Sequence, residues 1–260
     1  MMENKTEKIK QFWIDAGKSE LDADGLKPTA RDPFMQLINE HHILKYLDSG
    51  FRVLDIGCGE GTSTLKFAEK CKEIIGLDYS PTLIEQAKKK NTKIRFLVQD
   101  VLELDQNFPP NEFDAVISIR CIINIPEKEL QYKAVGNLFH VLKPGGLLFF
   151  SEGYRIGWDY LNAYRQRNGL PVMNLVEYNK LFDNVELESF LKSKGTLRDY
   201  VGFGDYLYGS RVTHPMLTGG KVAHASSINE MFYNQHINNG IWQKFDECSY
   251  AGIYVVQKHK

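Results

Sequence analysis

A glycine-rich turn at the end of an apolar segment is the sequence feature that most constrains the fold. The segment Val53–Ile56 runs into Gly57-Cys58-Gly59-Glu60-Gly61, and a helical pattern begins at Thr62. Glycines at alternate positions let the backbone turn sharply and let a ligand approach without a Cβ in the way. The pattern therefore predicts a strand, a tight turn and a helix, with a ligand at the turn.

Apolar runs alternate with helical segments after this turn, which indicates a parallel sheet. The predicted strands of this region cover residues 52–56, 73–77, 94–98, 115–119 and 147–151. The predicted helices between them cover residues 62–70, 81–91 and 127–142. Strands that are apolar on both faces and separated by amphipathic helices form parallel βαβ units. The expected fold class is therefore α/β, a doubly wound and mostly parallel sheet.

The chain is expected to form a single domain with additions before and after this core. Residues 1–50 are helical in pattern, with a break at 21–33, and Asp32 before Pro33 is a predicted N-cap for a helix that runs to Leu47. The core covers 51–153. In the remainder, 154–260, helices are predicted at 160–168 and 185–194, and strands at 196–203 and 251–257. The insertion between these strands, about 204–249, is too long for a hairpin and is expected to cover the site.

Charge and composition exclude several function classes. The formal net charge is −1, without a block of like charge, which disfavours a protein whose main task is to bind the nucleic-acid backbone. No apolar run approaches the roughly 18 residues of a transmembrane helix, so we expect a cytoplasmic protein without membrane insertion. Neither a disulfide framework nor a metal site is indicated, because no C-x-x-C pair or nearby histidine accompanies the cysteines Cys58, Cys71, Cys121 and Cys248.

Three carboxylates stand where the first three predicted strands end. Asp55 lies inside the end of the first strand, Asp78 follows the second strand 23 positions later, and Asp100 follows the third. The carboxyl ends of parallel strands meet at one edge of a sheet, where such sheets bind their ligands. A carboxylate at the second position is placed to accept hydrogen bonds from ribose hydroxyls. We therefore predict one site built from the glycine loop and three carboxylates.

The glycine spacing disfavours a nicotinamide-dependent oxidoreductase. A dinucleotide fingerprint would place its third glycine at position 62, where this chain has Thr62. Glu60 beside the loop would also repel a pyrophosphate.

In their order and spacing, these motifs resemble those of the class I S-adenosylmethionine-dependent methyltransferases. The resemblance covers about residues 51–153 and rests on the segments VLDIGCGEG, GLDYS, QDV, FDAVIS and LKPGGLLFF. It implies a seven-stranded Rossmann-like sheet with an antiparallel last strand, and S-adenosyl-L-methionine as cofactor with S-adenosyl-L-homocysteine as product. In such enzymes the protein mainly positions and desolvates the reactants, and it adds a base where the acceptor is a hydroxyl.

The resemblance also assigns residues to the methionine part of the cofactor. Gly57, Gly59 and Gly61 would wrap this part, with Asp55 near its amino group. Ser118 would lie beside the sulfonium, at the end of the fourth strand.

A second group of residues is assigned to the rest of the cofactor. Asp78 would bind the ribose hydroxyls, and Asp100 the adenine amino group with Val101 nearby. Tyr79 would pack on the adenosine, and Arg31 would reach the cofactor carboxylate.

The resemblance narrows the methyl acceptor as well. The segment 118–121 lacks the Asn/Asp-Pro-Pro-aromatic signature of enzymes that methylate nucleic-acid bases, and Ser118 stands where catechol-type enzymes have a magnesium-binding aspartate. Three parts of the chain resemble a bacterial subgroup associated with sugar or surface-polysaccharide biosynthesis: PTARDP at 28–33 before the core, SIRCIINIP at 118–126 within it, and LNAYR at 161–165 with GLP at 169–171 after it. We expect methylation of an oxygen or nitrogen of a small polar metabolite, such as a sugar or a phosphorylated intermediate.

Candidate substrate residues lie in the insertion. Tyr206 and Tyr208 offer aromatic faces for a sugar ring, and Arg211 offers a guanidinium for a phosphate or carboxylate.

Four residues are candidates for a general base. His214 and His224 lead because histidine titrates near neutral pH, and Glu152 and Tyr154, at the end of the fifth strand, are rivals.

Two alternatives stay open. An RNA methyltransferase shares this core, and the basic helix face of Lys88, Lys89, Lys90 and Lys93 is its only support, although such a face is commonly just solvated. A non-catalytic partner subunit would bind the cofactor without turnover, against which the intact glycine loop and carboxylates argue. The sequence gives no indication of the oligomeric state.

Overall fold

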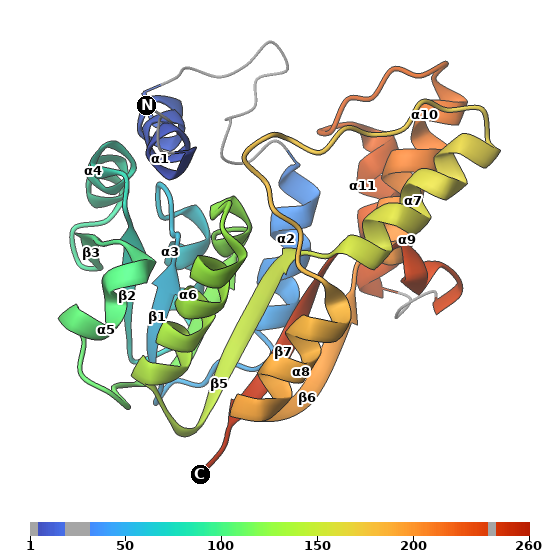
Figure 1. Cartoon of the computed structure of the whole chain (residues 1–260). Coiled ribbons are helices and arrows are strands. Elements are labelled where there is room, and N and C mark those ends of the chain that lie inside the picture. Colours follow the sequence, from blue (N-terminus) through green and yellow to red (C-terminus); the bar gives the residue numbers. More distant parts are fainter. Residues whose placement is uncertain (1–4, 19–31, 239–242) are drawn as a thin grey trace.

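The alternating apolar runs of the sequence form a mixed sheet with helices on both faces (Figure 1). The computed structural model describes residues 5–18, 32–238 and 243–260. Within these residues seven strands follow the order β3-β2-β1-β4-β5-β7-β6. Only β7 runs antiparallel to its neighbours, β5 and β6. The predicted doubly wound fold with an antiparallel last strand is therefore confirmed.

The strands lie close to their predicted positions. They are β1 (Arg52–Ile56), β2 (Glu73–Asp78), β3 (Arg95–Val98), β4 (Phe113–Ile119), β5 (Leu142–Gly153), β6 (Gly195–Gly202) and β7 (Ala251–Lys258). The largest difference is that β5 begins at Leu142, before the predicted 147, because Leu142 already pairs with Phe113 ahead of a bulge in β4.

The helices also follow the predicted pattern. In the first two thirds of the chain they are α1 (Lys5–Ala16), α2 (Pro33–Ile43), α3 (Thr62–Ala68), α4 (Pro81–Lys90), η2 (Val101–Glu103), α5 (Leu104–Asn107), η3 (Ile122–Asn124), α6 (Lys128–Val141) and α7 (Arg155–Arg167). The others are α8 (Asn184–Lys194), α9 (Gly204–Tyr208), η4 (Gly209–Thr213), α10 (His214–Leu217), α11 (Ser227–Asn238) and η5 (Gln243–Cys248). The predicted N-cap is confirmed, since Asp32 accepts the N–H groups of Phe34 and Met35, but α2 ends at Ile43 rather than at Leu47.

Both faces of the sheet are covered, which explains why its strands are apolar on both sides. Alternate residues of one strand point to opposite faces, as Val53 and Leu54 do in β1. Leu54 belongs to a core shared with α5, α6 and α8, whereas Val53 belongs to one shared with α2, α3 and the insertion. In Figure 1, α6 and α8 lie in front of the sheet and α2 lies behind it. Among the described residues, none of the helices combines the length and apolar character needed to cross a membrane.

The insertion between β6 and β7 folds into helices at the carboxyl edge of the parallel strands. It consists of α9, η4, α10, α11 and η5, and these gather beside α7 on one side of the molecule (Figure 1). The contact between α7 and η5 is close, because a Cβ on Gly157 would lie 2.2 Å from the Ser249 carbonyl carbon. The backbone of α7 therefore packs directly on the end of the insertion.

We predict that Gly157→Ala lowers the free energy of unfolding by about 1–3 kcal/mol, because the added methyl group separates α7 from Ser249. Gly136→Ala is the matched control in α6, where nothing lies within 4 Å of the added Cβ. This control is expected to raise the free energy of unfolding by about 0.5–1 kcal/mol through helix propensity. Urea denaturation measures both effects, and equal effects of the two variants would contradict the close contact.

Candidate functional site

The glycine loop after β1 is held in left-handed backbone conformations. The φ angles of Gly57 and Gly59 are +68° and +56°, which strain any residue with a Cβ. A Cβ on Gly57 would also lie 2.6 Å from the Cβ of Cys121, whereas no described residue lies within 4 Å of a Cβ built on Gly59. Gly57 is therefore needed for internal packing, and Gly59 leaves open space at the carboxyl end of β1.

Asp78 ties the end of β2 to this loop. Its Oδ2 accepts the N–H of Gly59 at 3.0 Å, and its Oδ1 accepts the N–H of Ser80 at 2.8 Å. Burial raises the pKa of Asp78 to about 6, although both backbone donors act in the opposite direction. The carboxylate predicted from the strand pattern thus lies directly against the glycine loop.

Asp55 is the second carboxylate at this edge and is only 4% exposed. Its Oδ2 accepts the hydroxyl of Thr64 at 2.6 Å. Burial and the nearby charge of Asp78 raise the pKa of Asp55 to about 7, against the lowering effect of the Thr64 hydrogen bond. Two neighbouring carboxyl groups with raised pKa values are typical of functional sites.

Asp100 stands beside a pocket of about 380 Å³. The pocket lies between the end of β3 and helix α1, and its lining residues are Glu7, Lys10, Gln11, Ile14, Tyr79, Val98, Gln99, Asp100 and Glu103. Among the described residues the buried Tyr79 hydroxyl has no hydrogen-bond partner. Val101, by contrast, packs into the core and does not line the pocket.

Lys10, which no pattern in the sequence indicates, covers this end of the site. Its Nζ lies 2.9 Å from Asp100 Oδ2, while Asp100 Oδ1 accepts the N–H of Leu102. On the same helix, Phe12 and Trp13 pack their rings against Tyr178. Nothing in the spacing of the sequence pairs residue 10 with residue 100, so only the tertiary structure identifies α1 as this wall.

Glu152 is fully buried at the end of β5 and holds the segment that follows β4. Its Oε1 accepts the Ser118 hydroxyl and the N–H groups of Cys121 and Ile122, and its Oε2 accepts the N–H of Ile123. Burial raises the pKa of this carboxyl despite these donors. The structure argues against Glu152 as a general base, because hydrogen bonds inside the protein occupy both of its oxygens. It also shows that the Ser118 side chain points to Glu152.

Tyr154 has a structural role as well. Its ring is fully buried, and its hydroxyl accepts the N–H of Glu152 and lies 3.0 Å from the carbonyl oxygens of both Phe150 and Gly252, which share its one proton. Burial raises the pKa of the hydroxyl well above its usual value. The structure therefore argues against Tyr154 as a base too, since hydrogen bonds that join β5 to β7 already occupy its hydroxyl.

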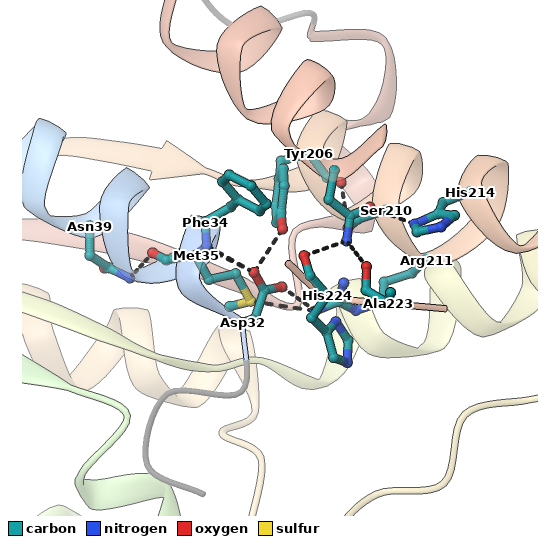
Figure 2. Close-up of polar contacts among 11 residues, drawn as sticks. Asp32, Phe34, Met35, Asn39, Tyr206, Ser210, Arg211, His214, Ala223 and His224 are labelled. Carbon is teal, nitrogen blue, oxygen red and sulfur yellow. Dashed lines mark hydrogen bonds and ion pairs between the residues drawn. The ribbon is translucent and has the colours of Figure 1, made fainter. Parts of the chain in front are cut away.

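Asp32 forms the centre of a buried cluster that joins α2 to the insertion. The Tyr206 hydroxyl donates to Asp32 Oδ1 at 2.8 Å, and Arg211 Nη2 pairs with Asp32 Oδ2. Figure 2 shows both side chains reaching the Asp32 carboxylate from the insertion. The Tyr206 ring is fully buried, so it offers no face to a sugar, contrary to the expectation from the sequence.

The other candidates in the insertion are also engaged in packing. The Tyr208 ring stacks on Phe245 with their centroids 3.8 Å apart. His214 is buried, with Nδ1 2.8 Å from Asn229 Oδ1, and the Asn229 amide donates to the backbone carbonyl of His224. The His224 side chain is partly exposed. Arg31 lies outside the described residues.

Comparison with known proteins agrees with this geometry. A family model described as a methyltransferase domain matches residues 53–146. The ubiquinone biosynthesis O-methyltransferase of Coxiella burnetii is 30% identical over 68% of this chain and 78% of its own length. A sterol 24-C-methyltransferase of Aspergillus fumigatus is 33% identical over 53% of this chain. The match covers 37% of that enzyme, and between 37% and 56% of the length of several other curated relatives.

A solved structure shares the fold. The N-methyltransferase NodS of Bradyrhizobium japonicum, determined in complex with S-adenosyl-L-homocysteine, aligns with 99% of this chain and all of its own at a TM-score of 0.53 and 16% identity.

We predict that Glu152→Gln lowers the free energy of unfolding by about 2–4 kcal/mol, because the amide nitrogen cannot accept hydrogen bonds from the buried donors. The exposed Glu129 in α6 provides the control, and Glu129→Gln is expected to change the free energy of unfolding by less than about 0.5 kcal/mol. Denaturant unfolding of the three proteins measures the difference. A Glu152→Gln protein as stable as the control would show that these hydrogen bonds do not hold the segment after β4.

Proposed function

The chain belongs to the class I S-adenosylmethionine-dependent methyltransferases, and we propose that it transfers a methyl group to an oxygen or nitrogen of a small polar metabolite. The observation that carries this proposal is the hydrogen bond from the N–H of Gly59 to Asp78, at the position where the glycine loop leaves open space. This contact joins the ends of β1 and β2 into one cradle at the carboxyl edge of the sheet.

The residues present fit S-adenosyl-L-methionine. Gly59 leaves space where a Cβ would stand, and Tyr79 and Asp100 line a pocket nearby. The Tyr79 hydroxyl has no hydrogen-bond partner in the part of the chain that the structure describes. Asp55 and Asp78 are poorly solvated. A ligand that supplies positive charge or hydroxyl donors therefore stabilises their ionised forms. When bound, this cofactor supplies a methyl group already activated on a sulfonium.

Within the proposal, each carboxylate has a separate binding role. Asp78 accepts hydrogen bonds from ribose hydroxyls, Asp55 stands near the methionine amino group, and Asp100 with Tyr79 holds the adenine. Glu152 acts as a positioning residue, because it fixes the segment after β4 that packs against Gly57. The site therefore orients and desolvates the reactants.

A hydroxyl acceptor also needs a base, and His224 is the candidate that we retain. Its side chain is partly exposed, whereas His214, Glu152 and Tyr154 are buried. The hydrogen bond from Asn229 to its carbonyl fixes the backbone of His224 within the insertion. For the acceptor itself we propose a sugar or phosphorylated intermediate of the kind found in surface-polysaccharide biosynthesis. This choice rests on segments 28–33 and 118–126, which resemble those of methyltransferases associated with such pathways.

The proposal is tested by calorimetric titration with S-adenosylmethionine and S-adenosylhomocysteine, followed by a screen for S-adenosylhomocysteine formation. The acceptor pools are sugar nucleotides, phosphorylated metabolites, amino acids and bulk RNA. Binding with turnover on a metabolite pool is the expected result. Turnover on RNA alone would replace the proposed acceptor, and absence of binding would overturn the cofactor site.

We predict that Asp78→Ala weakens S-adenosylmethionine binding by about 1–3 kcal/mol, because hydrogen bonds to a buried charged acceptor are lost. Asp105→Ala changes an exposed carboxylate in α5 and should leave the affinity unchanged. Calorimetry on both variants, with circular dichroism as a check of the fold, measures the effect. Equal affinities would remove the ribose role of Asp78.

We also predict that the affinity for S-adenosylmethionine rises with pH. The pKa values of about 7 for Asp55 and about 6 for Asp78 mean that both carboxyls are largely protonated at pH 5 and largely ionised at pH 8. Since the ionised forms bind the ligand, affinity should fall about tenfold or more between pH 8 and pH 6. Calorimetry across this range measures the change. A flat profile in the wild type would show that these carboxyls do not titrate with binding.

A further inference from the structure

Two arginines and one carboxylate are buried together where α2, α7 and the insertion meet. Arg211 is 7% exposed and Arg165 is 8% exposed. Arg211 pairs with Asp32, but among the described residues Arg165 donates only to the backbone carbonyls of Pro171 and Arg211. The described residues of the cluster therefore hold two positive charges and one negative charge. A buried charge without a counter-charge is unfavourable, so binding of an anion would stabilise this cluster.

One donor group of this cluster has no partner. The Nη1 of Arg211 is buried and makes no hydrogen bond among the described residues, while its Nη2 contacts Asp32 and lies 3.9 Å from the Met35 sulfur. Burial lowers the pKa of Arg165, and the nearby charge of Arg211 lowers it further, as expected for two cations that share too little negative charge. An unused N–H group on one guanidinium, with a second buried guanidinium near enough to lower its neighbour's pKa, matches what a carboxylate or phosphate requires.

The local backbone is also unusual at this point. Arg211 lies in η4, a five-residue π-helical turn between α9 and α10. Such turns are rare and frequently occur at functional sites, because the wider turn moves a side chain away from its regular helical direction. The turn therefore gives a second, independent indication of function at Arg211.

The cluster lies on the edge of the sheet that binds ligands. Helix α7 follows the carboxyl end of β5, and the insertion follows the carboxyl end of β6. Helix α2 lies against α3, which begins at the glycine loop, through the hydrogen bond from Gln36 to Ser63. The arginines thus stand above the same edge as Gly59 and Asp78, on the side covered by the insertion.

We propose that Arg211 and Arg165 form an anion subsite, and that the methyl acceptor carries a carboxylate or phosphate group that binds Arg211 Nη1. This inference rests on the proposed methyl transfer for its biological meaning, but the subsite itself can be tested separately. Asp32, which also accepts the Tyr206 hydroxyl, holds Nη2 of the Arg211 guanidinium in place, so Nη1 is preorganised for the anion. The subsite would select anionic acceptors over neutral ones of the same shape.

The test titrates inorganic phosphate and, separately, acetate into the protein, with and without S-adenosylhomocysteine, at an ionic strength held constant with sodium chloride. Thermal stabilisation reports binding. The variant Arg211→Lys keeps a positive charge opposite Asp32 but removes the Nη1 donor. Arg167→Lys is the matched control, since Arg167 is exposed on α7 and lies over the Tyr164 ring. We expect saturable binding of at least one anion, weakened at least tenfold in Arg211→Lys and unchanged in Arg167→Lys.

A second measurement needs only the wild-type protein, in case Arg211→Lys does not fold. Acceptors are offered in pairs that differ by one anionic group, such as a hexose and its phosphate, and S-adenosylhomocysteine formation is compared. Turnover confined to the anionic members is the expected result. Equal turnover of neutral members, or equal phosphate binding by wild type and Arg211→Lys, would overturn the subsite. Failure to bind S-adenosylhomocysteine would overturn the methyl transfer alone, because the titration without it still decides the subsite.

Discussion

The buried carboxylate of Glu152 is the interaction on which the geometry of the site depends. It accepts one hydroxyl and three backbone N–H groups, and so fixes the segment that joins β4 to η3. That segment carries Cys121, whose side chain fills the space where a Cβ on Gly57 would stand. The shape of the glycine loop is thus set from both sides, by Asp78 through the N–H of Gly59 and by Glu152 through Cys121.

The same edge of the sheet combines two kinds of buried charge. Beside the glycine loop, Asp55 and Asp78 are carboxylates whose pKa values burial has raised. On the side of the insertion, Arg165 and Arg211 exceed their single carboxylate partner, Asp32. An enzyme that binds a cationic sulfonium cofactor and an anionic acceptor would need this separation of charge, because each ligand then replaces the solvation that its partner residues lost on burial.

Most of the fold could be predicted from the sequence, because hydrophobic periodicity and turn residues act locally. The strand ends at Ile56, Asp78 and Val98 lie within one residue of their predicted positions. The glycine loop and the carboxylates Asp55, Asp78 and Asp100 could be placed at one edge for the same reason, since parallel strands bring their carboxyl ends together. The predictions were poorer for Tyr154, Glu152 and Tyr206, whose residue types suit catalysis or sugar stacking but whose burial gives them structural tasks.

The sequence alone thus determined the sheet, the class of cofactor and the edge at which Asp55, Asp78 and Asp100 gather, since these follow from patterns a few residues long. The tertiary structure decided which polar side chains remain available. Lys10 reaches Asp100, and Arg211 reaches Asp32, across separations in the chain that no local pattern records. A titratable group can bind a ligand only where hydrogen bonds within the protein do not already occupy it. Its burial and its hydrogen-bond partners are both set by packing between distant segments of the chain.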